Sequence, residues 1–165
     1  MQRTVKTTVL LVGEGNTEYA FLSYLKGLYI DRGSLKSVKI ENAHGGSPDC
    51  IIHRTIKLNP ADYDFSYVVL DPDRPFEEEG TELKVRKKKL QLIMPKPCIE
   101  ALFLRILNQA NIPPSTPECK RLFRNFLLDD EKTDKTKYQK IFSKEMVEER
   151  SNTLDELKQI LNIFK

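Results

Sequence analysis

A short apolar segment that runs into Gly-Glu-Gly and then straight into a helical pattern constrains this chain more than any other stretch. Residues 8–12 are aliphatic or β-branched, which is typical of a strand covered on both faces of a sheet. Residues 17–28 then carry apolar side chains at helical spacing. This order places Glu14 at the carboxyl end of a buried strand, beside a helix N-terminus. In open α/β sheets, that edge is where ligands bind.

The alternation of strand and helix continues through the first hundred residues. Further strands are expected at 37–41, 65–70 and 90–94, and further helices at 48–58, 77–89 and 98–107. Ser47 and Pro48 form a common helix start, with serine as N-cap and proline at the first helical position. Strands that alternate with helices predict an α/β fold: a mainly parallel, Rossmann-like sheet of four strands with helices on both faces.

The last third of the chain has a different character. Three helical segments of mixed charge are expected at 118–128, 137–149 and 153–164, without a strand signal between them. We therefore predict a core over residues 1–110 and a helical C-terminal extension, residues 111–165, packed on that core. A length of 165 residues is sufficient to bury one core of this kind.

Composition excludes several classes of protein. The 31% of charged and 39% of hydrophobic residues are ordinary for a globular chain, and the net charge of +3 permits nucleic-acid binding without implying it. No apolar run approaches the roughly 20 residues of a membrane span, and the polar N-terminus does not read as a signal peptide. The three cysteines match no zinc or disulfide framework, so we expect reduced thiols, a cytoplasmic location and no membrane association.

Acidic side chains follow two of the predicted strands. Glu14 comes after the first, and Asp71 and Asp73 come after the third. Because the carboxyl ends of parallel strands share one edge, these carboxylates are expected to converge. Such a set suits Mg²⁺ or Mn²⁺, and without a cation the carboxylates would repel one another. Asp71-Pro72-Asp73 taken alone is equally typical of an ordinary turn with capping acids.

Three motifs in order resemble a known family. Glu14-Gly15-Asn16-Thr17-Glu18 follows one strand, Asp71-Pro72-Asp73 follows another, and Pro97-Cys98-Ile99-Glu100 precedes an apolar helix. Together they resemble a Toprim domain, the metal-dependent catalytic domain of topoisomerases, primases and several nucleases. Within that group the chain is most similar to the RloB-like proteins, small prokaryotic Toprim proteins tied to restriction loci and to defence against foreign DNA. The resemblance covers about residues 8–108.

The resemblance implies roles for these acids. Asp71 and Asp73 would hold Mg²⁺, and Glu14 would act as general acid or base or as a second metal contact. Glu18 lies one helical turn beyond Glu14, where it either completes the metal shell or serves as a first-turn acid favoured by the helix dipole.

Glu100 is an acid within an apolar helix, so it requires a cation, a metal or a charged partner. We expect it to point to the metal cleft and to take part in catalysis; the alternative is a salt bridge to Arg74 or Arg105. The family usually carries an aromatic residue and then a histidine after this glutamate. Here those positions fall in Leu102-Phe103 and in the stretch from Arg105 to Asn108, where Arg105 is the candidate replacement.

Candidate nucleic-acid contacts lie in three places. His44 precedes Gly45-Gly46 near the same sheet edge, where backbone N–H groups can hold a phosphate; an ordinary turn is the alternative. Lys87 and Lys88 belong to the densest basic run, which is otherwise a solvated helix face. In the extension, Lys137 and Tyr138 form the most attractive pair, because a base can stack on tyrosine while the ammonium meets phosphate.

The sequence thus predicts a Mg²⁺- or Mn²⁺-dependent nuclease of the Toprim type that acts on DNA or RNA in defence or in a mobile element. Gly13-Glu14-Gly15 lacks the lysine and serine or threonine of a P-loop, so any ATP-driven step would need a separate ATPase partner. A homodimer is also open. The alternative is a non-catalytic module that binds a metal and a nucleotide or nucleic-acid end in the same cleft. A plain protein-interaction domain would instead leave the acids solvated.

Overall fold

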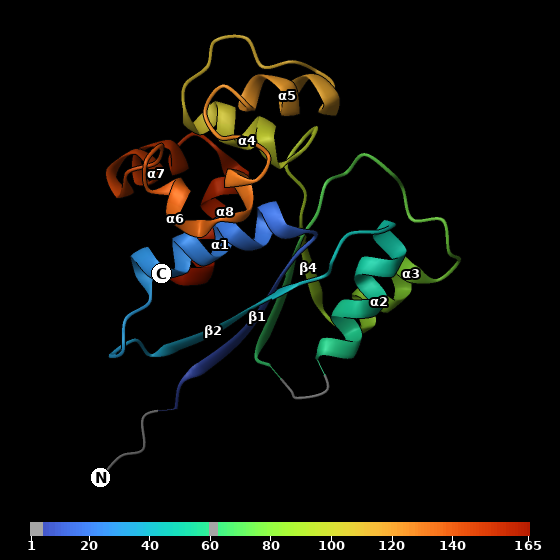
Figure 1. Ribbon diagram of the computed structural model, residues 1–165. Helices are drawn as coiled ribbons and strands as arrows, with labels where there is room; N and C mark the ends of the chain where they lie inside the picture. The colour runs from blue at the N-terminus through green and yellow to red at the C-terminus, as the bar shows by residue number, and fades with distance from the viewer. Residues whose placement is uncertain (1–4, 60–62) are drawn as a thin grey trace.

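The computed structural model describes residues 5–59 and 63–165, and its centre is a four-stranded sheet (Figure 1). The strands lie in the order β2-β1-β3-β4, and every neighbouring pair is parallel. This arrangement confirms the predicted α/β fold. The strands are β1 (Thr7–Gly13), β2 (Lys36–Asn42), β3 (Phe65–Val69) and β4 (Leu90–Ile93).

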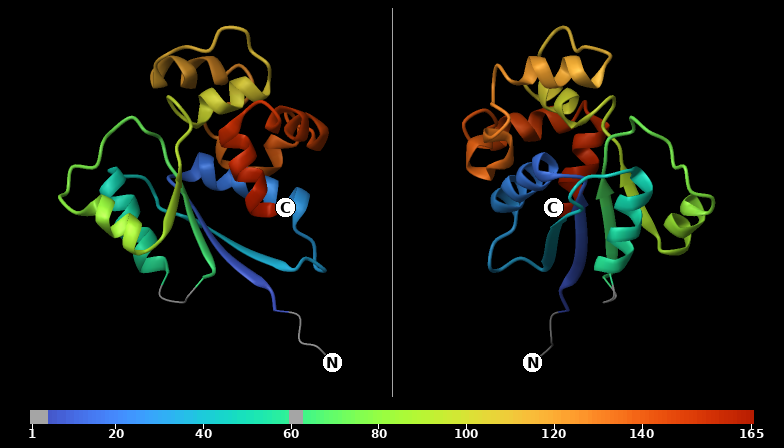
Figure 2. Two further views of the ribbon diagram at one scale, coloured as in Figure 1. Left: turned by 180° about the vertical axis from the view of Figure 1, so that it is seen from behind. Right: turned by 45° about the vertical axis from the view of Figure 1, so that its right-hand side comes forward.

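Helices cover both faces of the sheet (Figure 2). Val9 and Leu11 of β1 face α1 (Asn16–Tyr29), whereas Leu10 and Val12 face the side that carries α2 (Pro48–Leu58) and α3 (Thr81–Lys87). Because side chains alternate along a strand, a continuous apolar run supplies both cores at once. The apolar character of residues 8–12 follows from this double coverage.

Two glycines fix how α1 leaves β1. Gly15 is the N-cap of α1, so the helix begins at Asn16, one residue before the predicted start. A Cβ on Gly13 would lie 2.8 Å from the Cβ of Glu18, a distance that real side chains do not tolerate. Glycine at position 13 therefore allows the first turn of α1 to pack against the strand end, which brings Glu18 close to the sheet edge.

The predicted helix 77–89 is wrong in its first turn, and Asp49 explains the difference. The Asp49 carboxylate accepts hydrogen bonds from the backbone N–H groups of Glu77 (2.9 Å) and Glu78 (3.2 Å) and from the Thr81 hydroxyl (2.6 Å). These bonds hold residues 77–80 as a turn, and α3 begins only at Thr81. The partner lies 28 or more positions away, so local patterning could not reveal it.

The C-terminal half continues from α4 through several short helices on the α1 side of the sheet. The predicted helix 137–149 is two helices, because the Ser143 hydroxyl caps a new start by accepting from Met146 N–H at 3.1 Å. The predicted 118–128 helix ends earlier. The elements are α4 (Ile99–Ile106), α5 (Thr116–Phe123), η1 (Glu131–Thr133), α6 (Lys135–Tyr138), α7 (Lys144–Ser151) and α8 (Asp155–Phe164).

The helical extension and residues before 111 share one hydrophobic core. Helix α8 contacts both β2 and β4, and α4 and α5 lie beyond the carboxyl ends of the strands (Figure 1). Phe21 of α1 and Phe103 of α4 pack with Tyr138 and Phe142 of the extension, with ring centroids 4.7–5.8 Å from Phe21. Within residues 5–59 and 63–165, no helix has the length and apolar character needed to cross a membrane.

Substitution of Tyr138 tests whether the extension and the residues before 111 share one core. Its ring is fully buried, and its hydroxyl donates to the carbonyl of Lys132 at 2.9 Å. Tyr138→Ala is expected to lower the free energy of unfolding by about 3–5 kcal/mol, because it removes a buried ring and leaves a cavity. Tyr138→Phe, the matched control, loses only a hydrogen bond, at about 0.5–1.5 kcal/mol. Urea denaturation followed by circular dichroism measures both; equal effects of the two substitutions would contradict the packing role.

Candidate active site

The site lies where the order of the parallel strands reverses, between β1 and β3. From β1 the chain crosses to β2 on one side, and β3 lies on the other side, so the carboxyl ends of β1 and β3 flank the switch point at which α/β sheets bind ligands. Glu14 and Asp71 stand at those two ends. The Asp71 backbone N–H donates to Glu14 Oε2 at 2.8 Å, and Glu14 N–H donates to the carbonyl of Val69 at 2.9 Å. Glu14 thus bridges the ends of the two strands through a bond to the Asp71 backbone.

Two further carboxylates join them, and we call Glu14, Glu18, Asp71 and Glu100 the acid cluster. Glu18, Asp71 and Glu100 are buried, with 6%, 6% and 2% of their surface exposed, and Glu14 is half-buried. Glu18 accepts from Gly15 N–H at 3.0 Å, so it caps α1 and also faces the cluster. Asp71 Oδ1 accepts from Ile99 N–H at 2.9 Å, which ties β3 to the start of α4.

Burial and neighbouring negative charges raise the pKa of three of these acids, Glu14, Glu18 and Asp71. Loss of hydration, followed by the charges of Glu18, Glu14 and Glu100, raises the pKa of Asp71 to about 8. Loss of hydration and the neighbouring acids raise the pKa of Glu18 to about 7. The pKa of Glu14 is also raised, mainly by burial, although the Asp71 N–H acts in the opposite direction. The cluster therefore favours either protons or a bound cation.

One buried lysine contacts the cluster. Lys132 of η1 is only 5% exposed, and its Nζ lies 3.5 Å from Glu100 Oε1 and 2.8 Å from Asp129 Oδ1. The alternative prediction, a salt bridge from Glu100 to Arg74 or Arg105, is therefore wrong, because Lys132 is the partner. Arg105 pairs instead with Glu156 at 3.3 Å. Lysines are usually exposed, and Lys132 stands in a lysine-rich stretch, so nothing in its local sequence signals burial.

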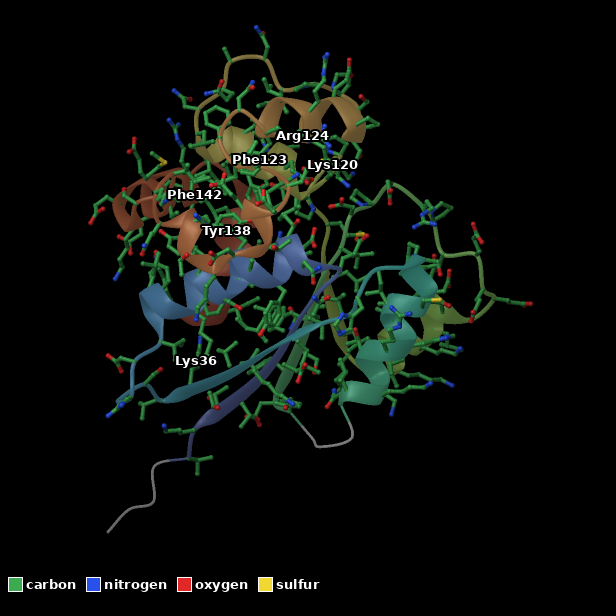
Figure 3. The ribbon with its side chains drawn as sticks, viewed as in Figure 1. Lys36, Lys120, Phe123, Arg124, Tyr138 and Phe142 are labelled. Atoms are coloured by element: carbon green, nitrogen blue, oxygen red, sulfur yellow. The ribbon has the colours of Figure 1, made fainter. Side chains whose placement is uncertain are left out.

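A second lysine lies at the rim. Lys120 is exposed on the underside of α5 (Figure 3), and its pKa is raised by the charges of Glu100, Asp71 and Glu18 even though partial burial acts against this. Asp73 is exposed and close enough to raise the pKa of Glu14. The sequence predicted a role for Asp73 but not for Lys120. Lys120 lies far from the acids along the chain, so no local pattern indicates that it lies close to them in space.

The donor set fits a divalent cation. Among the described residues, Glu100 Oε2 is buried without a hydrogen-bond partner. One ligand atom each of Asp71, Cys98 and Glu100 lies within 4.8 Å of the others. Several carboxylates around one ammonium leave a negative excess that a hard cation with oxygen ligands would neutralise. Of the three predicted magnesium ligands, Asp71 belongs to this group, whereas Asp73 and Glu14 do not.

The structure does not support the predicted stacking on Tyr138. Its ring is fully buried among Phe21, Phe103 and Phe142, so no base can reach it, and that prediction is wrong. Figure 3 shows Tyr138 and Phe142 inside the helical layer. The neighbouring Lys137 is half-buried and lies 3.8 Å from Glu131 Oε1.

The other basic candidates divide between the two edges of the sheet. Lys87 and Lys88 are exposed but immediately precede β4, at the amino edge, and so lie away from the acid cluster. His44 is exposed, in a left-handed backbone conformation (φ 60°), and its loop reaches the site. Gly45 N–H donates to the Glu14 carbonyl at 2.7 Å, and Arg74 Nη2 donates to the Gly46 carbonyl at 3.0 Å.

Searches with this chain found no matching family model, no matching curated protein and no matching solved structure. The resemblance to the RloB-like Toprim proteins therefore stays a prediction based on the three motifs.

The acid cluster predicts how stability depends on pH in the metal-free protein. Folding raises the pKa of Asp71 from 3.8 to about 8 and that of Glu18 from 4.5 to about 7. The stabilisation is complete below the unfolded-state values and is lost as the pH rises through the folded-state values. In EDTA, Tm should therefore fall between about pH 4 and pH 8; each kcal/mol lost corresponds to roughly 2–4 °C for a chain of this size.

Asp71→Asn should remove much of that fall, because the amide stays neutral and its oxygen can still accept from Ile99 N–H. Glu79→Gln, at an exposed acid outside the cluster, is the matched control and should leave the pH profile unchanged. Differential scanning calorimetry across the pH range measures all three proteins. A flat wild-type profile would contradict the repulsion inferred for the cluster.

Proposed function

We propose that this chain is a Mg²⁺-dependent nuclease of the Toprim type, which hydrolyses phosphodiester bonds in defence against foreign DNA or in a mobile element. The observation that carries the proposal is the meeting of Glu14 and Asp71 at the switch point, joined by the 2.8 Å bond from Asp71 N–H to Glu14 Oε2. The three ordered motifs and their resemblance to RloB-like proteins support the same activity.

In this proposal Asp71 and Asp73 hold the metal ion, with Glu14 as general acid or base or as a further contact. When bound, Mg²⁺ would polarise the phosphoryl oxygen and stabilise the charge that develops on it. Glu14 is suited to proton transfer because burial raises its pKa while the side chain stays half-exposed at the rim. The Asp71 N–H holds one Glu14 oxygen in place, and the other is free to face a water molecule or the substrate.

Glu18 and Glu100 are more deeply buried, which favours a supporting role behind the metal ligands. Glu18 adds negative charge next to Glu14, and its bond to Gly15 N–H fixes it to the helix start. Glu100 adds charge next to Asp71 and is balanced in part by Lys132 at 3.5 Å. Both would raise the affinity of the site for a cation without contacting the phosphodiester.

Cations around the site offer a route for a nucleic-acid backbone. Lys120 and Arg74 are exposed, and both lie close enough to Glu14 for their positive charges to lower its pKa. A groove of about 440 Å³ runs past the rim acid, lined by Pro72, Asp73, Lys96, Pro97, Pro114 and Thr116. We propose that the backbone enters along this groove, with His44, Lys137 and the separate basic run containing Lys87 and Lys88 as further contacts. DNA and RNA are both proposed substrates.

A divalent-metal cleavage assay on DNA and RNA tests the activity. Glu14→Gln and Asp71→Asn should each lower the single-turnover rate with Mg²⁺ or Mn²⁺ by about 100-fold or more, the scale of a lost acid–base or metal-ligand contribution. Glu79→Gln is the control and should cleave like the wild type. Unchanged rates in both cluster variants would contradict the proposed roles.

Binding without cleavage is the distinct alternative. If the wild type binds Mn²⁺ and nucleic-acid ends but cleaves neither DNA nor RNA, the chain is a non-catalytic module that uses the same cleft. A separate ATPase partner and a homodimer belong to the proposal as well. Sedimentation equilibrium of the purified chain tests the dimer directly.

Lys120 is expected to contribute to substrate binding. Lys120→Gln should weaken the binding of single-stranded oligonucleotides and lower the slope of log K against log salt by about 0.7, the value for one lost phosphate contact. Lys57→Gln removes the same charge from an exposed position on α2 and serves as the control. Fluorescence anisotropy in Ca²⁺ at several salt concentrations measures both; equal slopes for wild type and Lys120→Gln would contradict the contact.

A further inference from the structure

A thiol stands on the inner side of the acid cluster, away from the rim. Cys98 is the N-cap of α4 and is fully buried. Its Sγ and one carboxylate oxygen each of Asp71 and Glu100 lie within 4.8 Å of one another. Two elements thus deliver three metal-ligand side chains to one point: Asp71 from the loop after β3, and Cys98 and Glu100 from the start of α4.

One carboxylate oxygen of Glu100 has no hydrogen-bond partner among the described residues. Glu100 Oε1 lies 3.5 Å from the Lys132 ammonium, but Glu100 Oε2 is buried and has no hydrogen-bond partner in the described part of the chain. An unpaired carboxylate oxygen at 2% residue exposure is costly. A cation bound between Glu100, Asp71 and Cys98 would remove that cost.

The chemistry of the donors selects the ion. Mg²⁺ prefers oxygen ligands alone, whereas Zn²⁺ is bound by thiolates and carboxylates together. With Zn–S near 2.3 Å and Zn–O near 2.1 Å, tetrahedral ligands lie roughly 3.4–3.6 Å apart. The three side chains therefore need to close by about 1 Å from their 4.8 Å limit. Three protein ligands leave a fourth position for water.

We propose that Asp71, Cys98 and Glu100 form an inner metal site for a thiophilic divalent ion of the Zn²⁺ class, distinct from the Asp71–Asp73 position assigned above to Mg²⁺. Binding replaces the Cys98 S–H bond by an S–Zn bond and releases the proton to solvent. Two carboxylates and one thiolate then carry three negative charges, which Zn²⁺ and the Lys132 ammonium balance. The site does not depend on nuclease activity, but it shares Asp71 with the proposed magnesium position.

Cobalt spectroscopy tests the site in the full-length, metal-stripped chain. Co²⁺ takes the place of Zn²⁺, and a cobalt–thiolate bond produces a charge-transfer band in the near ultraviolet. We expect one Co²⁺ per chain to produce this band, excess Zn²⁺ to abolish it and excess Mg²⁺ to leave it in place. The double variant Cys50→Ser/Cys119→Ser keeps Cys98 as its only thiol and should retain the band.

Two substitutions within the site complete the design. Cys98→Ser should remove the band, and Glu100→Gln should weaken Co²⁺ binding by at least about tenfold. The double variant keeps the test valid if Cys98→Ser does not fold. Absence of the band in the wild type, or its loss in the double variant, would overturn the inference.

The proposed nuclease function is tested separately. Asp73→Asn and Glu14→Gln lie outside the inner site and should leave the cobalt band in place, whether or not they alter cleavage. A wild-type band without cleavage supports the inner site and counts against the nuclease. Cleavage without a band does the reverse.

Discussion

The hydrogen bond from the Asp71 backbone to the Glu14 carboxylate joins the two halves of the sheet at its switch point, and the site is arranged around it. The last pair of residues between β1 and β3 is Gly13 with Val69, so the Asp71 N–H lies beyond the ladder of these two strands. The Glu14 carboxylate accepts from this N–H and is held at the strand end by it. Glu18 and Glu100 then face this point from α1 and α4, so the charge of the cluster is concentrated where the sheet is open to a ligand. Each of these positions depends on parallel strands that end at one edge.

Concentrated negative charge requires a counter-charge, and the C-terminal extension supplies part of it. Lys132 reaches Glu100 from η1, and the Tyr138 hydroxyl holds the Lys132 carbonyl from within the aromatic core. The extension therefore contributes to the electrostatics of the cluster as well as to burial. One ammonium does not balance the cluster, and the remaining excess is the physical basis for both proposed metal positions.

Much of the architecture was predictable from local signals. The apolar run at 8–12, Ser47 followed by Pro48, and the repeated order of strand and helix led to a parallel four-stranded sheet with covered faces. The acids at the strand ends were equally visible, because their meaning depends only on strand direction. The helix at 77–89 was wrong at its start, since Asp49 binds that turn from a distant element.

The sequence by itself determined the sheet, its two apolar faces and the edge at which Glu14 and Asp71 meet. These features follow from periodicity and from the short-range chemistry of glycine, serine and proline. Only the tertiary structure decided which cations and thiols join that edge. Lys132, Lys120 and Cys98 reach the acids through packing of the helical layer, and the same packing buries Tyr138, which the sequence had assigned to the surface. Local patterns record how a residue lies in its own helix, whereas contacts between helices depend on side chains far apart in the chain.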